Sequence, residues 1–273
     1  VPDFDFNIMR ENQDLYHITS NVLLRLRKVF EEKKPDIVLV QGDTTTAMAT
    51  SLAAFYMKIP VGHVEAGLRT YNKYAPYPEE INRCIASIIA EYHFAPTEWA
   101  KNNLVREGVS ANRIFVTGNT VIDALLTAAN KINSSDWQDK FDRTFGFLDK
   151  GRRLVLITGH RRESFGEGFK NICTAIKELA LMFPNCNFLY PVHLNPNVQK
   201  PVKEILGRKG LLNIHLIEPV EYLPFVYLLN RAYIILTDSG GVQEEAPSFG
   251  KPVLVMRDTT ERPEGVKAGV VKL

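Results

Sequence analysis

Cysteine is scarce in this chain of 273 residues: Cys84, Cys173 and Cys186 lie far apart, each within an apolar segment. An odd number of widely spaced cysteines fits neither a disulfide framework nor a zinc site. We therefore expect a protein of a reducing compartment, the cytoplasm.

Long hydrophobic runs and an excess of one charge are also lacking. The net charge is only +2, so the composition predicts neither a nucleic acid nor an anionic membrane as partner. No apolar run approaches the roughly 20 residues of a membrane-spanning helix. The chain also has no Walker loop, no Gly-x-Gly-x-x-Gly fingerprint and no metal-ligand set. We expect no metal and no other cofactor.

What the chain does contain is an alternation of short apolar runs with segments of helical periodicity. The runs suit buried strands at 37–40, 61–64, 92–95, 114–117, 154–158, 187–192, 214–217, 233–237 and 253–256. Strands that alternate with helices predict parallel sheets covered on both faces, which is an α/β fold.

Two Rossmann-like domains are expected, because 273 residues are long for a single hydrophobic core. We place the boundary so that residues 1–119 form an N-terminal domain and residues 120–273 a C-terminal domain. Between Asn130 and Arg153, polar and charged residues replace both the apolar runs and the helical periodicity. We predict a surface excursion there.

Polar residues recur where the predicted strands end, after the runs at 37–40, 61–64, 154–158, 187–192 and 233–237. In open parallel sheets, ligands bind beyond the carboxyl ends of the strands. The repetition predicts one ligand-binding cleft formed by both domains.

The segment 237–245 combines such a strand end with a probable helix start. Ser239, Gly240 and Gly241 lie where free backbone N–H groups can cradle an anion, and phosphate is the natural anion for such a site. The simpler interpretation is a tight strand-to-helix turn without a ligand. The polar loops at the other strand ends favour the phosphate site.

Carboxylates gather in the N-terminal half, at Asp43, Glu65, Glu79 and Glu80. A cleft with several acids can keep one protonated and another ionised, as general acid and base catalysis requires. Helix capping is the alternative for Asp43, and a harmless place in a first helical turn is the alternative for the Glu79-Glu80 pair.

The C-terminal half supplies cations and aromatic rings. His160 and Arg161 begin a loop with enough donors to hold a diphosphate or to stabilise a departing one, and His193 has a similar position after its own strand. Arg262 is a candidate for contact with a sugar or phosphate, and Phe225 for stacking on a base. The alternatives are a structural histidine, a solvated charged loop and a core aromatic.

Together these motifs resemble the non-hydrolysing bacterial UDP-N-acetylglucosamine 2-epimerases, and they match in order along the whole chain. The motifs are Gln41-Gly42-Asp43-Thr44-Thr45-Thr46, Gly62-His63-Val64-Glu65-Ala66-Gly67-Leu68-Arg69, Pro78-Glu79-Glu80 with Asn82-Arg83, Thr117-Gly118-Asn119-Thr120-Val121-Ile122-Asp123, Gly159-His160-Arg161-Arg162-Glu163-Ser164, the His193 loop, Asp238-Ser239-Gly240-Gly241 with Gln243-Glu244-Glu245, and Arg257-Asp258-Thr259-Thr260-Glu261-Arg262-Pro263.

The resemblance implies a glycosyltransferase-B type fold in which the C-terminal domain holds UDP and the N-terminal domain faces the sugar. It implies catalytic roles for Asp43, Glu65, Glu79 and His160. It implies substrate binding by Phe225, Ser239, Gly240, Gly241, Glu245 and Arg262.

The resemblance further implies a homodimer and a second UDP-N-acetylglucosamine molecule as allosteric activator, bound with the help of His193 and Arg161. Family members carry an additional strand and loop before this sequence and a terminal helix after it. We therefore expect segments at both ends that the given sequence lacks, and we expect activity to depend on them.

The implied reaction interconverts UDP-N-acetylglucosamine and UDP-N-acetylmannosamine through loss of UDP and the C2 proton, giving 2-acetamidoglucal, followed by re-addition. Three alternatives stay open. A glycosyltransferase of the same fold would use the same cradle but would not exchange the C2 hydrogen. A hydrolysing epimerase would release free N-acetylmannosamine, and a binding-only fragment would catalyse nothing.

Overall fold

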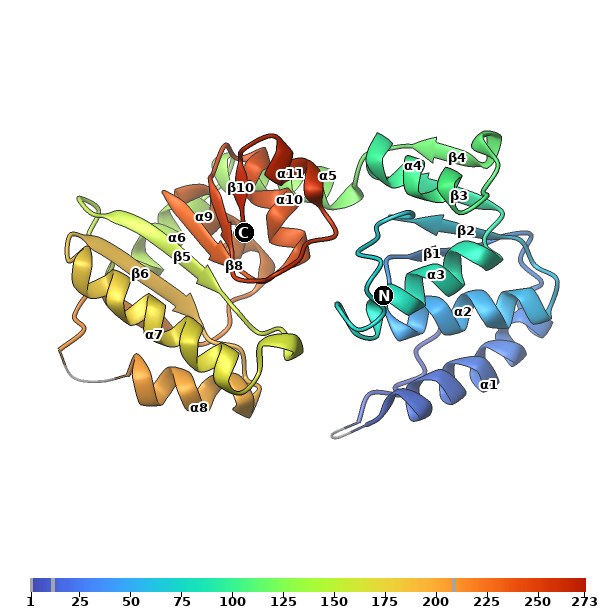
Figure 1. Cartoon of the computed structure of the whole chain (residues 1–273), viewed down its shortest axis with the longest axis horizontal. Helices are drawn as coiled ribbons and strands as arrows, with labels where there is room; N and C mark the ends of the chain where they lie inside the picture. Colours follow the sequence, from blue (N-terminus) through green and yellow to red (C-terminus); the bar gives the residue numbers. More distant parts are fainter. Residues whose placement is uncertain (1, 11–12, 208–209) are drawn as a thin grey trace. The chain divides into compact units, whose positions relative to one another are not determined.

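The computed structural model describes residues 2–10, 13–207 and 210–273. The chain divides into two compact units, the first ending at Asn119 and the second beginning at Thr120 (Figure 1). Each unit is built around its own parallel sheet. No helix among the described residues is long and apolar enough to cross a membrane.

The first unit has four described strands that lie side by side in chain order. They are β1 (Val38–Gln41), β2 (Val61–Val64), β3 (Tyr92–Ala95) and β4 (Ile114–Val116), and every neighbouring pair is parallel. The connecting helices are α1 (Leu15–Lys33), α2 (Thr45–Tyr56), α3 (Glu79–Ile89) and α4 (Glu98–Arg106). Helix α2 packs against both α1 and α3. The core of this unit includes Phe30 of α1, Val40 of β1 and Ala54 of α2.

The second unit has a six-stranded parallel sheet in the order β10-β9-β8-β5-β6-β7. Its strands are β5 (Arg153–Thr158), β6 (Cys186–Pro191), β7 (Ile214–Ile217), β8 (Ile234–Thr237), β9 (Val253–Val255) and β10 (Val271–Lys272). Its helices are α5 (Thr120–Asn133), α6 (Trp137–Thr144), α7 (Glu167–Met182), α8 (Pro196–Ile205), α9 (Tyr222–Arg231), α10 (Gly240–Ser248) and α11 (Pro263–Lys267). Helices α7 and α8 pack against each other (Figure 1).

The strand order of the second unit creates a topological switch point between β5 and β8. From β5 the chain builds outward through β6 and β7, then returns to add β8, β9 and β10 on the other side. In open α/β sheets, ligands bind at such a switch point, in the crevice beyond the carboxyl ends of the strands. The sequence places His160 and Arg161 after β5, and Ser239 to Gly241 after β8.

The predicted surface excursion at residues 130–153 is wrong. Helix α5 continues to Asn133, and α6 follows at Trp137–Thr144. Phe141, Phe145 and Leu148 are almost fully buried in the core of the second unit. Their spacing of four and three residues puts them on one face of a short helix and the turn that follows it, with charged residues on the other face.

The predicted α/β class with two Rossmann-like parallel-sheet domains is confirmed. Each predicted strand is present, and its ends differ by no more than one residue from those expected. Such runs of consecutive apolar residues arise because both faces of a parallel sheet are covered.

Candidate active site

In the first unit, two of the predicted acids follow neighbouring strands at the carboxyl edge of the sheet. Asp43 comes after β1, and Glu65 comes directly after β2. Glu65 has a positive φ of 66°, and a Cβ placed on Gly42 would lie 3.5 Å from its Oε2 atom. The Glu65 carboxylate therefore lies beside the β1 loop that carries Asp43.

The Asp43 carboxylate forms an ion pair rather than a helix cap. Thr44 caps α2, since its side chain accepts a hydrogen bond from the Ala47 N–H. Oδ2 of Asp43 is paired with Nη2 of Arg83, whose side chain is almost completely buried. Asn82 also donates to the Asp43 carbonyl at 2.9 Å. Helix α3 thereby fixes the β1 loop and leaves the Asp43 carboxylate partly exposed.

The adjacent residues Glu79 and Glu80 have different surroundings in the first turn of α3. Glu80 is 3% exposed, pairs with Arg83 Nη1 at 3.3 Å, and accepts the N–H groups of Thr70 and Tyr71 at 2.9–3.1 Å. Its carboxylate is occupied in holding the 70–71 segment against the helix. Glu79 is only partly buried and is the acid of this pair that solvent can reach.

His63 lies in the β1–β2 pair, opposite Val40. It is completely buried, and its Nε2 contacts the Gly42 carbonyl at 2.8 Å. Burial lowers the pKa of His63 to about 4, against an opposing effect of the Gly42 hydrogen bond. His63 therefore supports the loop before Asp43 as a neutral ring.

Acidification is expected to destabilise the protein through His63. Its folded pKa of about 4 lies below the ordinary 6.5, so the unfolded chain binds more protons between these values. Stability is full above about pH 6.5 and declines as pH falls towards 4, by up to about 3 kcal/mol for this group. Urea unfolding across this range measures the loss, and His63→Gln should flatten the curve. An unchanged pH dependence in His63→Gln would refute the assignment.

In the second unit, side chains fasten the loop after β5 to the turn after β8. The hydroxyls of Thr158 and Thr237 are 2.5 Å apart. Asp238, which is fully buried, accepts the backbone N–H groups of His160 at 2.7 Å and Arg161 at 2.8 Å through Oδ2. The Tyr190 hydroxyl donates to the Gly159 carbonyl at 2.7 Å. These contacts therefore fix both loops at the switch point.

His160 and His193 are brought together at this edge of the sheet. Their rings stack with centroids 5.3 Å apart and an interplanar angle of 16°. Nδ1 of His193 accepts the Asn195 N–H at 3.1 Å, which orients the His193 ring. Burial lowers the pKa of His160, while the nearby Asp238 carboxylate raises it and His193 and Arg161 lower it further.

Helix α10 begins at Gly240, with Ser239 as its N-cap residue and no side-chain cap. The first N–H groups of such a helix are available to an anion. A Cβ on Gly240 would lie 2.5 Å from Nη1 of Arg262 and 2.7 Å from Oε1 of Glu261. The helix start and the Arg262 guanidinium are therefore in close contact, which only glycine permits.

Arg262 is held over the helix start by two carboxylates. Its Nε pairs with Glu244, and its Nη1 pairs with Glu261 at 2.5 Å. Arg257 neutralises Glu261 from the other side at 3.1 Å and binds Glu163 at 2.5 Å. The predicted substrate-binding arginine is thus positioned by an ion-pair network that links α10, the 257–262 loop and the loop after β5.

Glu245 and Phe225 lie further along the same edge. Glu245 is 7% exposed, and its pKa is raised by burial and by the charge of Glu244, and lowered by a hydrogen bond with Tyr222. Phe225, in α9, is partly buried and packs against the core of the second unit. Its structural surroundings therefore agree with the core interpretation.

Sequence reasoning missed Arg83 and Asp238 as members of these clusters, although both belong to quoted motifs. Arg83 is buried between Asp43 and Glu80, and Asp238 connects the two loops at the switch point. The sequence offered one signal for these two residues. Each is a charged residue in the same polar motif as a predicted site residue.

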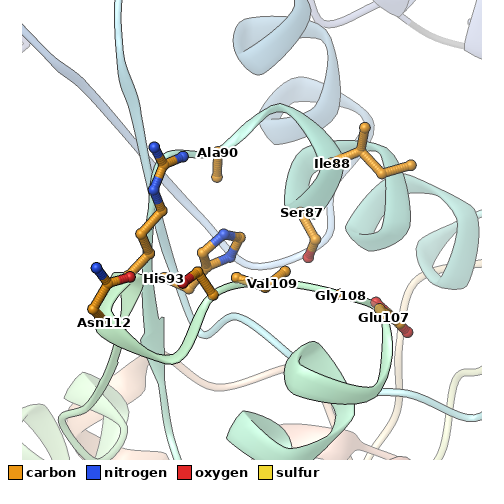
Figure 2. Close-up of a pocket in the computed structure, with 10 residues that line it drawn as sticks. Ser87, Ile88, Ala90, His93, Glu107, Gly108, Val109 and Asn112 are labelled. Atoms are coloured by element: carbon orange, nitrogen blue, oxygen red, sulfur yellow. The ribbon is translucent and has the colours of Figure 1, made fainter.

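A separate pocket of about 570 Å³ lies at the opposite, amino edge of the first unit's sheet (Figure 2). It is lined by the end of α3, by His93 at the start of β3 and by residues 107–113 before β4. None of the predicted site residues lines it. The acids after β1 and β2 therefore lie outside this pocket.

Comparison with known proteins identifies the family. A sequence profile of UDP-N-acetylglucosamine 2-epimerases matches residues 1–273. A UDP-N-acetylglucosamine 2-epimerase of Yersinia pestis is 59% identical over 273 residues, which are 100% of this chain and 72% of that protein. The chain belongs to the UDP-N-acetylglucosamine 2-epimerase family. It is therefore an isomerase, and the resemblance inferred from its motifs is confirmed.

Two solved epimerase structures share the fold. The UDP-GlcNAc 2-epimerase of Neisseria meningitidis, bound to UDP-GlcNAc, is 57% identical with a TM-score of 0.96. The match covers 99% of this chain and 72% of the Neisseria chain. The Methanocaldococcus jannaschii enzyme, in complex with UDP-GlcNAc and UDP, is 38% identical with a TM-score of 0.86. That match covers 100% of this chain and 74% of the Methanocaldococcus chain. The chain thus spans about 72% of the length of its close relatives.

Proposed function

We propose that this epimerase-family chain interconverts UDP-N-acetylglucosamine and UDP-N-acetylmannosamine by inversion at C2. The observation that carries the proposal is the combination of two features: a carboxylate cluster after β1 and β2, and a start of helix α10 that has no side-chain cap and lies against the Arg262 guanidinium. The first suits proton transfer and the second suits a diphosphate.

The C2 hydrogen is too weakly acidic for simple removal, so the reaction uses the neighbouring bond to UDP. A base takes the C2 proton, the C2 electron pair forms the C1–C2 double bond, and the C1–O bond breaks with UDP leaving as an anion. The product is 2-acetamidoglucal. A proton then adds to the opposite face of C2, and a UDP oxygen attacks C1. Atoms and electrons balance without an oxidant.

Asp43, Glu65 and Glu79 are assigned to the proton transfers at the two faces of C2. Asp43 and Glu79 are partly accessible, and Glu65 lies beside the Asp43 loop. Inversion requires proton handling at both faces, so at least two groups, or one that relocates, must serve. The buried Glu80 is excluded from this work because backbone N–H groups and Arg83 occupy its oxygens.

The second unit is assigned to UDP. Ser239, Gly240 and Gly241 offer the helix start to the diphosphate, Glu245 and Phe225 take the ribose and the uracil, and Arg262 contacts the substrate. His160 stabilises the charge that develops on the leaving diphosphate.

Three finer assignments complete the proposal. A second UDP-N-acetylglucosamine acts as activator with the help of His193 and Arg161, the active protein is a homodimer, and it works in the cytoplasm. The stacked pair of His160 with His193 supports the first, because it connects the activator residues with the catalytic loop.

Incubation with UDP-N-acetylglucosamine in deuterated water tests the reaction. We expect NMR to show deuterium at C2 and the appearance of UDP-N-acetylmannosamine with a form extended to the length of its relatives. A sigmoidal dependence of the initial rate on substrate is expected from the activator. Absence of exchange in the extended form would refute the proposal in favour of a transferase, and free N-acetylmannosamine would indicate a hydrolysing enzyme.

A further inference from the structure

Asp238 has one carboxylate oxygen whose role the loop contacts do not explain. Oδ2 accepts both N–H groups of the loop after β5, but Oδ1 is buried and has no hydrogen-bond partner among the described residues. A buried carboxylate oxygen without a partner costs free energy. The group that faces it is the His160 ring, whose Nδ1 is 3.6 Å away.

We propose that Asp238 is a positioning residue that holds His160 with its proton on Nδ1 and, once a diphosphate is bound, in the doubly protonated form. Nδ1–H then faces Asp238, and Nε2–H is free to donate to the leaving diphosphate. The inference rests on the proposed function for its catalytic meaning. The separation of 3.6 Å is longer than a hydrogen bond, and catalytic hydrogen bonds commonly tighten when the ligand is bound.

The charges around His160 support this assignment. Asp238 is the acidic group that faces the ring, while His193 and Arg161 oppose its protonation. Burial also favours the neutral form, so the free protein keeps His160 largely uncharged at neutral pH. A bound diphosphate adds negative charge at Nε2 and favours the imidazolium, provided that Asp238 compensates the charge at Nδ1.

Asp238→Asn is the decisive variant, because it separates the two oxygens' roles. The amide oxygen can still accept both loop N–H groups, whereas the NH₂ group replaces Oδ1 and now donates towards Nδ1. We expect the His160 pKa, followed by NMR of its ring, to fall by about one unit or more. The tautomer should change from Nδ1–H to Nε2–H, and the alkaline limb of epimerisation should move to lower pH.

Tyr190→Phe is the matched control, since it loosens the same loop without changing its charge. The lost hydrogen bond to Gly159 should lower stability or turnover but leave the His160 pKa and the alkaline limb in place. Equal pKa values in Asp238→Asn and the wild type would overturn the proposal.

Two further results keep the test decisive. If Asp238→Asn does not fold, the tautomer in the wild type decides, with Nδ1–H in support and Nε2–H against. If His160 responds as expected while no variant or extended form epimerises, the coupling of Asp238 to His160 stands and the proposed function fails.

Discussion

Replacement of Asp43 by asparagine is expected to slow deuterium exchange at C2 by about 10²–10⁴-fold, the contribution of one general acid or base. The asparagine keeps the size and one oxygen for Arg83, so the loop after β1 should retain its position. The lost property is the ability to take or deliver a proton. Initial exchange rates by NMR at saturating UDP-N-acetylglucosamine measure the effect.

Glu80→Gln is the control for this experiment, because it also removes a carboxylate from Arg83. Glu80 is buried and bonded to the 70–71 backbone, so its loss should reduce stability by about 3–5 kcal/mol, the cost of breaking a buried ion pair. Exchange in the folded fraction should stay within a few-fold of wild type. If Glu80→Gln slowed exchange as much as Asp43→Asn, the ion pair itself, and not the Asp43 proton, would be what the reaction needs.

The strands and the edge that carries the site were predictable from the sequence for physical reasons. Runs such as 154–158 are apolar at successive positions because helices cover both faces of the sheet. Once the sheet is parallel, the carboxyl ends of its strands share one edge, and polar residues after them must lie there. The positions of Asp43 and Gly240 at such edges followed from this rule alone.

Sequence patterns failed to predict a helix that was too short, and they could not distinguish two glutamates that are neighbours in the chain. Helix α6 has only eight residues, and its one buried aromatic residue, Phe141, was obscured by charged neighbours. Glu79 and Glu80 are adjacent, and nothing local indicates which one turns inward. The decision depends on the 70–71 segment, whose N–H groups Glu80 accepts.

Long-range pairs were beyond the sequence altogether. Arg83 meets Asp43 across 40 residues, and Asp238 meets His160 across 78. Both residues were visible within their motifs, but their roles exist only when the fold brings distant loops together. Charged residues of this kind position the candidates that sequence patterns do identify.

Gly240→Ala is expected to weaken binding of UDP by at least about tenfold. The new Cβ would lie 2.5 Å from Nη1 of Arg262 and 2.7 Å from Oε1 of Glu261, closer than real atoms approach. Both contacts are ends of side chains, so the fold can adjust, but only by moving the guanidinium away from the helix start. Loss of one charged hydrogen bond costs about 1.5–3 kcal/mol, and 1.4 kcal/mol is tenfold in affinity. Calorimetric titration with UDP measures the change.

Gly168→Ala provides the comparison, since Gly168 lies in the first turn of α7 and a Cβ there meets no atom within 4 Å. Alanine favours a helix over glycine, so this variant should be as stable as wild type or slightly more, with unchanged affinity for UDP. Gly240→Ala should differ from it in affinity far more than in thermal stability, because Arg262 and Glu261 shift without unfolding the core. Wild-type affinity in Gly240→Ala would mean that neither the helix start nor Arg262 holds the diphosphate, and the assignment of UDP to this crevice would have to be abandoned.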